Sequence, residues 1–253
     1  MTWRKSKIFL SLLLIITIMF VSYLSKDQSV KTMGDVVELP IYSVDRKDKV
    51  VSLTFDINWA ETEYLYDILD TLDKYNIKGT FFIMGAWVEY SQENVDKLKA
   101  INERGHEIGN HSYKHVNFTQ VSESKVDEEL RKTDEVVKKY TGKKIKLFRF
   151  PSGEYNKQYY RMVVSRGYIP IQWDVDSVDW KQEGEEIEYN NVINKVNNGS
   201  IILFHNNAKY TPKNLEKIIK ELICRGYKFT KVSQMLHSES TYIDQNGKQF
   251  GKN

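Results

Sequence analysis

The sequence predicts an α/β fold in which parallel strands alternate with helices. Apolar segments with strand character alternate with amphipathic helical segments about seven times between residues 50 and 236. This alternation is typical of parallel sheets that are covered by helices. Polar side chains follow several of the strands, and parallel α/β folds build their sites at these carboxyl ends. A nearly closed barrel and an open doubly wound sheet both fit the pattern.

Eight short segments have the composition of strands, because they are rich in apolar, β-branched or aromatic residues. They comprise residues 36–44, 50–55, 80–84, 106–109, 147–150, 168–173, 200–204 and 227–232. The first is at best an edge strand or an arm, because Pro40 cannot donate a ladder hydrogen bond. No G-x-G-x-x-G motif follows the second, which disfavours dinucleotide binding.

Helical segments separate these strands, and apolar residues spaced three or four apart give each long one a buried face. They lie around residues 65–72, 95–101, 121–140, 159–166, 192–196 and 215–222. Glycine follows several of them, as Gly105 and Gly142 do, which is typical of a helix end. We expect Thr211 and Pro212 to cap the last helix. In the polar tail, residues 237–253, an Asn246-Gly247 turn is compatible with a small hairpin.

The composition fits a single large domain with no charge-based case for a nucleic-acid partner. The chain has 253 residues, of which 41% are hydrophobic, enough for a substantial core. The net charge is +3, and residues 1–7 carry three basic side chains and no acid, so the remainder is neutral on balance. The single cysteine, Cys224, excludes an intramolecular disulfide. We expect a monomer.

The N-terminus has the pattern of an export signal. The basic residues 1–7 precede an uncharged apolar run, residues 8–24, which is at the short end for a membrane span. Basic residues before such a run stay in the cytoplasm, so we expect the remaining chain to be outside. Because no small-x-small cleavage site is evident, a signal anchor is favoured over a cleaved signal peptide. Residues 25–35 are polar and are interpreted as a linker.

Two of the five histidines, His111 and His115, lie four residues apart. At helical pitch this spacing places both imidazoles on one face, where they can share a divalent metal. Such a metal polarises a carbonyl group or activates a water molecule. The alternative is a pair of ordinary surface histidines at the start of a helix, and the spacing alone does not decide between the two.

Five polar clusters follow predicted strands. They are Asp56; His111 with His115; Arg149; Asp176 with Asp179-Trp180; and His205. Each has an ordinary structural explanation on its own, such as a helix cap, an ion-pair partner or a packed indole. Five at the same rim of one sheet favour a functional site.

These clusters belong to motifs that resemble those of the polysaccharide deacetylases, the family 4 carbohydrate esterases. The motifs are Thr54-Phe55-Asp56, His111-Ser112-x-x-His115, Arg149-Phe150-Pro151, Asp176-x-x-Asp179-Trp180 and Leu203-Phe204-His205. They occur in the family's order within residues 50–236, and we assign residues 36–236 to the catalytic domain. The family fold is a distorted (β/α) barrel. The first motif, continued by Ile57-Asn58-Trp59, is most similar to the sporulation-associated subgroup of spore-forming Firmicutes.

The resemblance implies a role for each matching residue. Asp56 matches the general base, Arg149 the residue that orients it, His205 the general acid and Asp179 the carboxylate that orients the acid. His111 and His115 match the imidazole ligands of a divalent metal, zinc or cobalt. Trp180 matches the indole beside the acid, and Leu203 matches the wall around the acetyl methyl group. A base and an acid on either side of a polarised carbonyl supply what amide hydrolysis needs.

The chain departs from the family pattern at two positions. The family has a second Asp after the base as third metal ligand, and Ile57 at this position cannot ligate. Asn58 offers a neutral amide oxygen one residue later. A weak metal site, catalysis without a tightly held metal and loss of catalysis all stay open. In the third motif Ser152 replaces a family tyrosine, although its backbone N–H can still help to hold an oxyanion.

The leading functional hypothesis is an exported, membrane-anchored enzyme that removes N-acetyl groups from an amino-sugar polymer. Peptidoglycan or its spore-cortex form is the expected substrate. The alternative is a non-catalytic glycan-binding or envelope-assembly relative that has lost its metal, and Ile57 is its main support. A third option, a metal-dependent amidohydrolase of a small amide, fits export less well.

Overall fold

In the computed structural model, which describes residues 38–238 and 241–251, seven parallel strands form a half-barrel. Their order is β6-β5-β4-β3-β2-β8-β7, and every pairing between neighbours is parallel. The strands are β2 (Val50–Ile57), β3 (Thr80–Ile83), β4 (Glu107–Asn110), β5 (Leu147–Phe148), β6 (Ile169–Pro170), β7 (Val175–Asp176) and β8 (Ile201–His205). A further strand, β9 (Lys228–Phe229), pairs with the start of β2. The predicted parallel α/β architecture is confirmed, as a half-barrel that stays open between β6 and β7 within the described residues.

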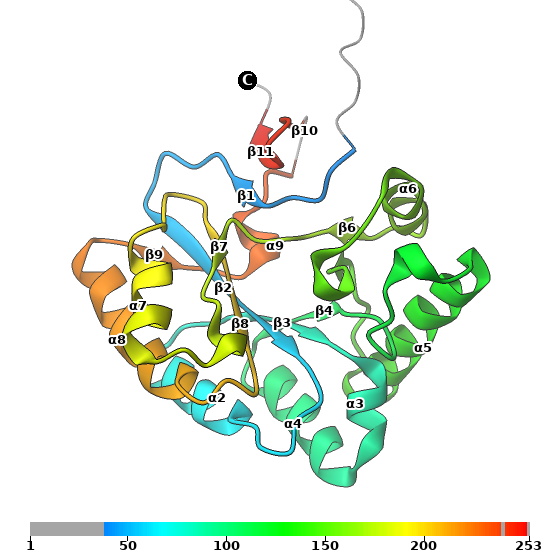
Figure 1. Ribbon diagram of the computed structural model, residues 1–253, viewed down its shortest axis with the longest axis horizontal. Helices are drawn as coiled ribbons and strands as arrows, with labels where there is room; N and C mark the ends of the chain where they lie inside the picture. Colours follow the sequence, from blue (N-terminus) through cyan, green and yellow to red (C-terminus); the bar gives the residue numbers. More distant parts are fainter. Residues whose placement is uncertain (1–37, 239–240, 252–253) are drawn as a thin grey trace, which may run out of the picture. The chain divides into compact units, whose positions relative to one another are not determined.

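Helices surround the strands, as Figure 1 shows, with α7 and α8 on one side and α3, α4 and α5 on the other. The helices are α2 (Leu65–Lys74), α3 (Gly85–Tyr90), α4 (Gln92–Glu103), α5 (Glu123–Thr141), α6 (Lys157–Ser165), α7 (Glu185–Ile193), α8 (Thr211–Cys224) and α9 (Val232–Met235). Among them, α3 and α9 were not predicted. Within the described part of the chain, no helix is long and apolar enough to cross a membrane. The predicted basic start, membrane segment and linker, residues 1–35, lie outside the described residues.

The alternation of side chains along β2 sends polar residues into the concave interior. Leu53, Phe55 and Ile57 pack in the apolar layer beneath the helices. Successive strand residues point to opposite faces, so Thr54 and Asp56 point inward. Because the apolar residues of this strand face the helices, Asp56, the predicted base, lies inside the half-barrel.

Several strand predictions were too long. The strands predicted for residues 36–44 and 227–232 are reduced to Ser43–Val44 and Lys228–Phe229, and in two others proline and strand pairing limit the ladder. The strand predicted for residues 147–150 ends at Phe148, and a 3-10 helix, Pro151–Gly153, begins soon afterwards. Proline has no N–H to continue a ladder. The strand predicted for residues 168–173 is likewise reduced to Ile169–Pro170. The chain then forms the unpredicted strand β7 beside β8.

The N-terminal arm and the tail pair with each other in a small second sheet. Its strands are β1 (Ser43–Val44), β11 (Lys248–Gly251) and β10 (Thr241–Ile243), in the order β1-β11-β10. β10 and β11 form an antiparallel hairpin whose turn includes Gly247, with φ of 78°. Ile41 also bridges to Ile171, next to β6, and the Val44 N–H donates to the Gly199 carbonyl, just before β8. The arm thus links strands on either side of the half-barrel.

We predict that Gly109→Ala destabilises the domain by about 1–3 kcal/mol, as overpacking does. A Cβ atom at Gly109 would lie 2.5 Å from the Phe82 ring. Phe82 is fully buried inside the half-barrel and cannot move away freely. Urea unfolding followed by circular dichroism measures the loss. A wild-type free energy of unfolding in this variant would contradict the prediction.

Candidate active site

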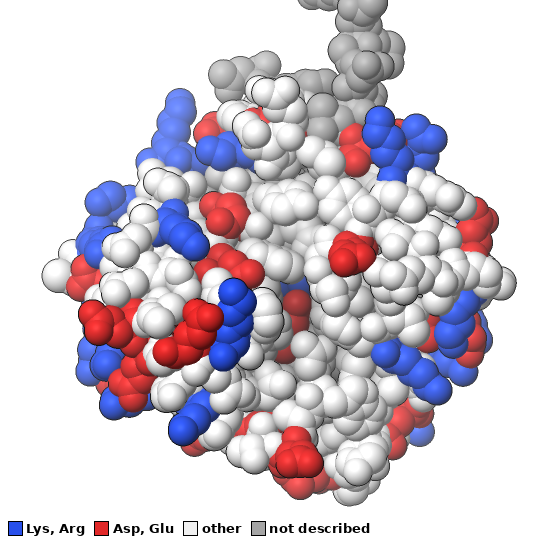
Figure 2. All heavy atoms as spheres, in the orientation of Figure 1, with Lys and Arg blue, Asp and Glu red and all other residues white. Residues whose placement is uncertain are grey.

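A cleft of about 330 Å³ opens at the carboxyl ends of the strands. Figure 2 shows a hollow near the centre of the molecule, with acidic and basic atoms at its floor. The lining residues are Asp56, Asn58, His115, Ser152, Trp173, Asp176, Trp180, Leu203 and His205. Seven of the ten predicted site residues are among them, and the other three, His111, Arg149 and Asp179, are buried beside them. The structure therefore brings the predicted set together.

Asp56 is held by a fully buried arginine. Arg149 Nη1 donates to Asp56 Oδ1 over 2.7 Å, and Nη2 donates to the Gln172 carbonyl over 3.0 Å. The guanidinium also lies 4.1 Å from the centre of the Phe82 ring. Burial by itself would raise the pKa of Asp56, but the charge of Arg149 and the nearby His111 and His205 hold that pKa below its usual range. Asp56 is therefore ionised at neutral pH, as a general base must be.

The Nε2 atom of His111 carries a lone pair that is free to bind a ligand. Its Nδ1 lies 3.0 Å from the Arg149 carbonyl oxygen, which can only accept, so Nδ1 carries the proton. Burial lowers the pKa of His111 to about 4, so the ring is neutral at pH 7. Its Nε2 lies 3.5 Å from Asp56 Oδ2. A neutral imidazole with this tautomer is suited to bind a metal.

The two predicted metal ligands meet through a turn, and the helix expected here is absent. The rings of His111 and His115 have centres 4.8 Å apart. Residues 111–115 contain no helical residue, and Ser112 and His115 have φ of 69° and 58°. The prediction of helical pitch is therefore wrong, although the rings do converge. Left-handed backbone at two non-glycine residues produces the convergence.

His205 is held by Asp179 through two contacts. Asp179 Oδ2 accepts from the His205 backbone N–H, and Oδ1 pairs with the ring Nδ1, both over 2.7 Å. Burial by itself would lower the pKa of His205, but Asp179, with Asp56 and Asp176 nearby, raises it above its usual value. The ring therefore favours its protonated form, as a general acid should.

Thr211 supports this pair. It lies in the first turn of α8, where Tyr210 is the N-cap residue and makes no side-chain capping bond. The predicted capping role of Thr211 is therefore wrong. Its hydroxyl donates instead to Asp179 Oδ2 over 3.0 Å. The start of α8 thus fixes the carboxylate that orients His205.

Asp56 and His205 occupy matching positions on neighbouring strands. Their Cα atoms are register partners in the parallel pairing of β2 with β8. Neighbouring strands lie about 4.8 Å apart, so both side chains border the same small volume. The two ionisable groups expected to act on one scissile bond are therefore adjacent.

The donor set around the imidazoles is incomplete for a strong metal site. Ile57 is fully buried and packs toward the helices, so it offers no ligand. Within residues 38–238 and 241–251, no three His, Cys, Asp or Glu side chains are grouped to hold a metal. The lone pair of His111 nevertheless faces the Asp56 carboxylate, and a cation would offset the repulsion between these two acceptors.

Asn206, which the sequence analysis missed, shapes the loop after β2. It is fully buried; its Oδ1 accepts from the Asn58 N–H over 2.9 Å, and its Nδ2 donates to the Asn58 carbonyl over 3.1 Å. This clamp keeps Asn58 at the cleft. In the sequence, the signal that could have identified Asn206 was its position directly after His205. Trp173 and Asp176 also line the cleft without an assigned role.

The match to known proteins decides the family. The family model for polysaccharide deacetylase matches residues 43–171. The chain belongs to the polysaccharide deacetylase family. The resemblance read from the five motifs is thereby confirmed.

Several bacterial proteins are similar to this chain over most of the described domain. YlxY of Bacillus subtilis is 32% identical over 197 residues, which cover 78% of this chain and 60% of YlxY. The peptidoglycan-N-acetylmuramic acid deacetylase PdaA of the same species is 32% identical, covering 77% of this chain and 74% of PdaA. The PdaA structure has a TM-score of 0.72, with 78% of this chain and 85% of PdaA covered.

A family 4 carbohydrate esterase pseudoenzyme from Bacillus anthracis is also similar. It is 32% identical, with a TM-score of 0.73, and the match covers 79% of this chain and 70% of the pseudoenzyme. A mutant of it, solved separately, is described as having restored enzymatic activity. Similarity therefore extends both to named deacetylases and to a pseudoenzyme.

We predict that Asp179→Asn lowers the pKa of His205, because the carboxylate that stabilises the imidazolium is removed. The measurement is an NMR titration of the histidine ring protons. Glu183→Gln, an exposed change near the same loop, should leave the titration unchanged. An identical His205 titration in Asp179→Asn and wild type would contradict the prediction.

Proposed function

We propose that this chain is a deacetylase that hydrolyses N-acetyl groups on an amino-sugar polymer. The observation that carries the proposal is the pairing of an Arg-held carboxylate with an Asp-held imidazole on neighbouring strands. The pKa of Asp56 is lowered and the pKa of His205 is raised, so the carboxylate favours its ionised form and the imidazole its protonated form. Two titratable groups tuned in this way are suited to act as general base and general acid.

The proposed reaction uses this chain's groups at each end of the acetamide. Asp56 takes a proton from the attacking water, and Arg149 keeps the carboxylate oriented. His205 gives a proton to the departing amine, while Asp179 stabilises the ring. Leu203 borders the cleft beside the acetyl methyl group, and the Ser152 backbone N–H assists at the oxyanion. Positioning both groups before reaction lowers the barrier.

A divalent metal, zinc or cobalt, is proposed to bind at His111 and His115, with Asn58 as a neutral third ligand. The neutral ring of His111 and its free Nε2 support this assignment. When bound, the metal would polarise the acetamide carbonyl. Because the site lacks the carboxylate that a second Asp would supply, we expect weak binding.

Peptidoglycan, or its spore-cortex form, is the proposed substrate. The name of the relative PdaA states an action on peptidoglycan N-acetylmuramic acid. Trp180 is 56% exposed at the cleft and can stack on a sugar ring. Such a substrate agrees with the proposed position outside the cell membrane, anchored through residues 8–24.

A second candidate is a glycan-binding or envelope-assembly protein without catalysis. Ile57, which cannot ligate a metal, and the similarity to a pseudoenzyme favour it. The retained Asp56–Arg149 and His205–Asp179 pairs weigh against it, because binding alone needs neither an acid nor a base.

Acetate release from peptidoglycan and chitooligosaccharides separates the two candidates. We expect release by the wild type that rises with added zinc or cobalt and falls with a chelator. Asp56→Asn and His205→Ala should each lower kcat/KM by at least about 100-fold, as loss of a general base or acid does. Tight glycan binding without acetate release under every metal condition would support the non-catalytic candidate.

We predict that Asn58→Asp strengthens metal binding by about tenfold or more, because a carboxylate replaces a neutral amide beside the cation. Asn58→Ala should weaken it. Isothermal titration with zinc measures both. Equal affinities in the three proteins would show that Asn58 is not a ligand.

A further inference from the structure

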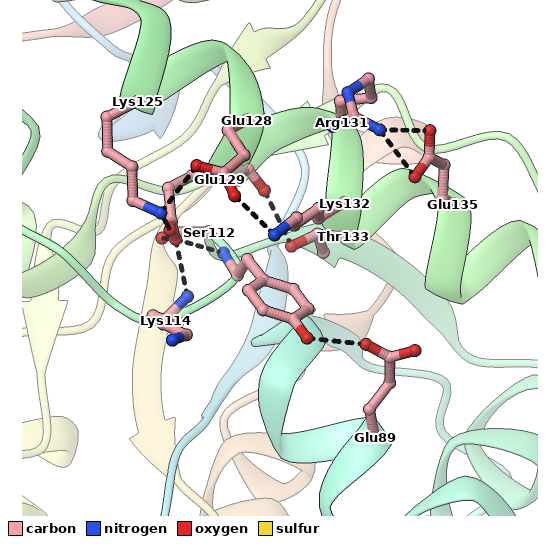
Figure 3. Close-up of polar contacts among 11 residues, drawn as sticks. Glu89, Ser112, Lys114, Lys125, Glu128, Glu129, Arg131, Lys132, Thr133 and Glu135 are labelled. Carbon is pink, nitrogen blue, oxygen red and sulfur yellow. Dashed lines mark hydrogen bonds and ion pairs between the residues drawn. The ribbon is translucent and has the colours of Figure 1, made fainter. Parts of the chain in front are cut away.

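A buried carboxylate on α5, that of Glu129, contacts the turn between the two imidazoles, and Figure 3 shows it beside Ser112 and Lys114 of this turn. Glu129 Oε2 accepts three hydrogen bonds: from the Ser112 hydroxyl over 2.7 Å, the Tyr113 N–H over 2.9 Å and the Lys114 N–H over 2.6 Å. Glu129 is fully buried. One carboxylate oxygen therefore holds three consecutive residues, all of which lie between His111 and His115.

The turn needs such a restraint because its backbone is strained. Ser112 and His115 are non-glycine residues with left-handed φ angles, each of which costs on the order of 1 kcal/mol. From the other side, the Gly85 and Ala86 N–H groups at the start of α3 donate to the carbonyls of Ser112 and Tyr113, over 3.1 and 2.8 Å. The turn is thus held between α3 and α5.

The charge of Glu129 is balanced nearby. Lys125 Nζ lies 3.0 Å from Glu129 Oε1 and 2.9 Å from Glu128 Oε2. Hydrogen bonds to a carboxylate are stronger than those to a neutral acceptor. A glutamine at this position would keep an acceptor and lose both the charge and the pairing with Lys125. The half-buried neighbour Glu128 shares the lysine and, within the described part of the chain, forms no hydrogen bond or ion pair with residues 111–115.

Glu129 is not the only residue that attaches α5 to the core. The buried face of the helix also carries Val126, Leu130, Val136 and Val137, which pack in the main apolar core. A carboxylate among these apolar residues loses its hydration, which is unfavourable unless specific hydrogen bonds replace the water. All three hydrogen bonds that Oε2 accepts come from the turn. The buried carboxylate therefore stabilises the turn.

We propose that Glu129 is a positioning residue that fixes the 111–115 turn so that its two imidazoles converge on a divalent cation. The convergence of the rings and the hold on the turn are features of the described structure. The cation is the part that rests on the proposed function.

The first test measures the turn without any metal. Hydrogen exchange of the full-length chain, followed by mass spectrometry, compares wild type with Glu129→Ala, Glu129→Gln and the matched control Glu128→Gln. We expect the Tyr113 and Lys114 amides to exchange about tenfold faster in Glu129→Ala, less so in Glu129→Gln, and at the wild-type rate in Glu128→Gln. Wild-type exchange of both amides in folded Glu129→Ala would overturn the proposal.

The second test measures the ligand geometry through cobalt binding, followed by visible absorbance. We expect about 10- to 100-fold weaker binding in Glu129→Ala, the size of effect seen when partners that orient metal ligands are removed. Glu129→Gln should partly restore the affinity, and Glu128→Gln should match wild type. Unchanged affinity and spectrum in Glu129→Ala would overturn the proposal. If the wild type binds no cobalt, the metal part of the proposed function fails, and the exchange result still decides the role of Glu129.

Discussion

The buried contact between Arg149 and Asp56 organises most of the candidate site. The guanidinium orients the Asp56 carboxylate and keeps it ionised inside the half-barrel. The backbone carbonyl of the same arginine fixes the proton of His111 on Nδ1, so one residue sets both the base and a proposed metal ligand. An unpaired charge at this depth would be strongly unfavourable, which couples the two groups tightly. The guanidinium also stacks on the Phe82 ring, which packs against Gly109, and this contact holds it in place.

A carboxylate from a different element supports each half of the site. Asp179, from the loop after β7, holds His205 by its backbone and its ring, and Thr211 at the start of α8 holds Asp179. Glu129, on α5, holds the turn of His111 and His115. His111 and His115 lie on a loop after β4, and loops need such anchors to keep one geometry. The helices of the half-barrel therefore contribute to the site as well as cover the sheet.

Much of the fold followed from local pattern. The strand at β2 and the helices α2, α5 and α8 were predicted close to their observed bounds, because their apolar periodicity is set by neighbours in the sequence. The short β7 and α3 were missed, since segments of two to six residues have little periodicity. The turn at His111 was mistaken for a helix start, because a four-residue spacing does not distinguish a helix from a tight turn.

The sequence by itself determined the alternation of strands and helices, the family, and the residue types that gather at the cleft, because these depend on local periodicity and on side-chain chemistry. Only the tertiary structure decided that the Arg149 carbonyl selects the His111 tautomer and that Glu129 clamps the 111–115 turn. Each of these depends on contacts between segments far apart in the chain. Such contacts exist only once distant segments have packed together, and for Glu129 the sequence signal was a charged residue on the buried face of a helix.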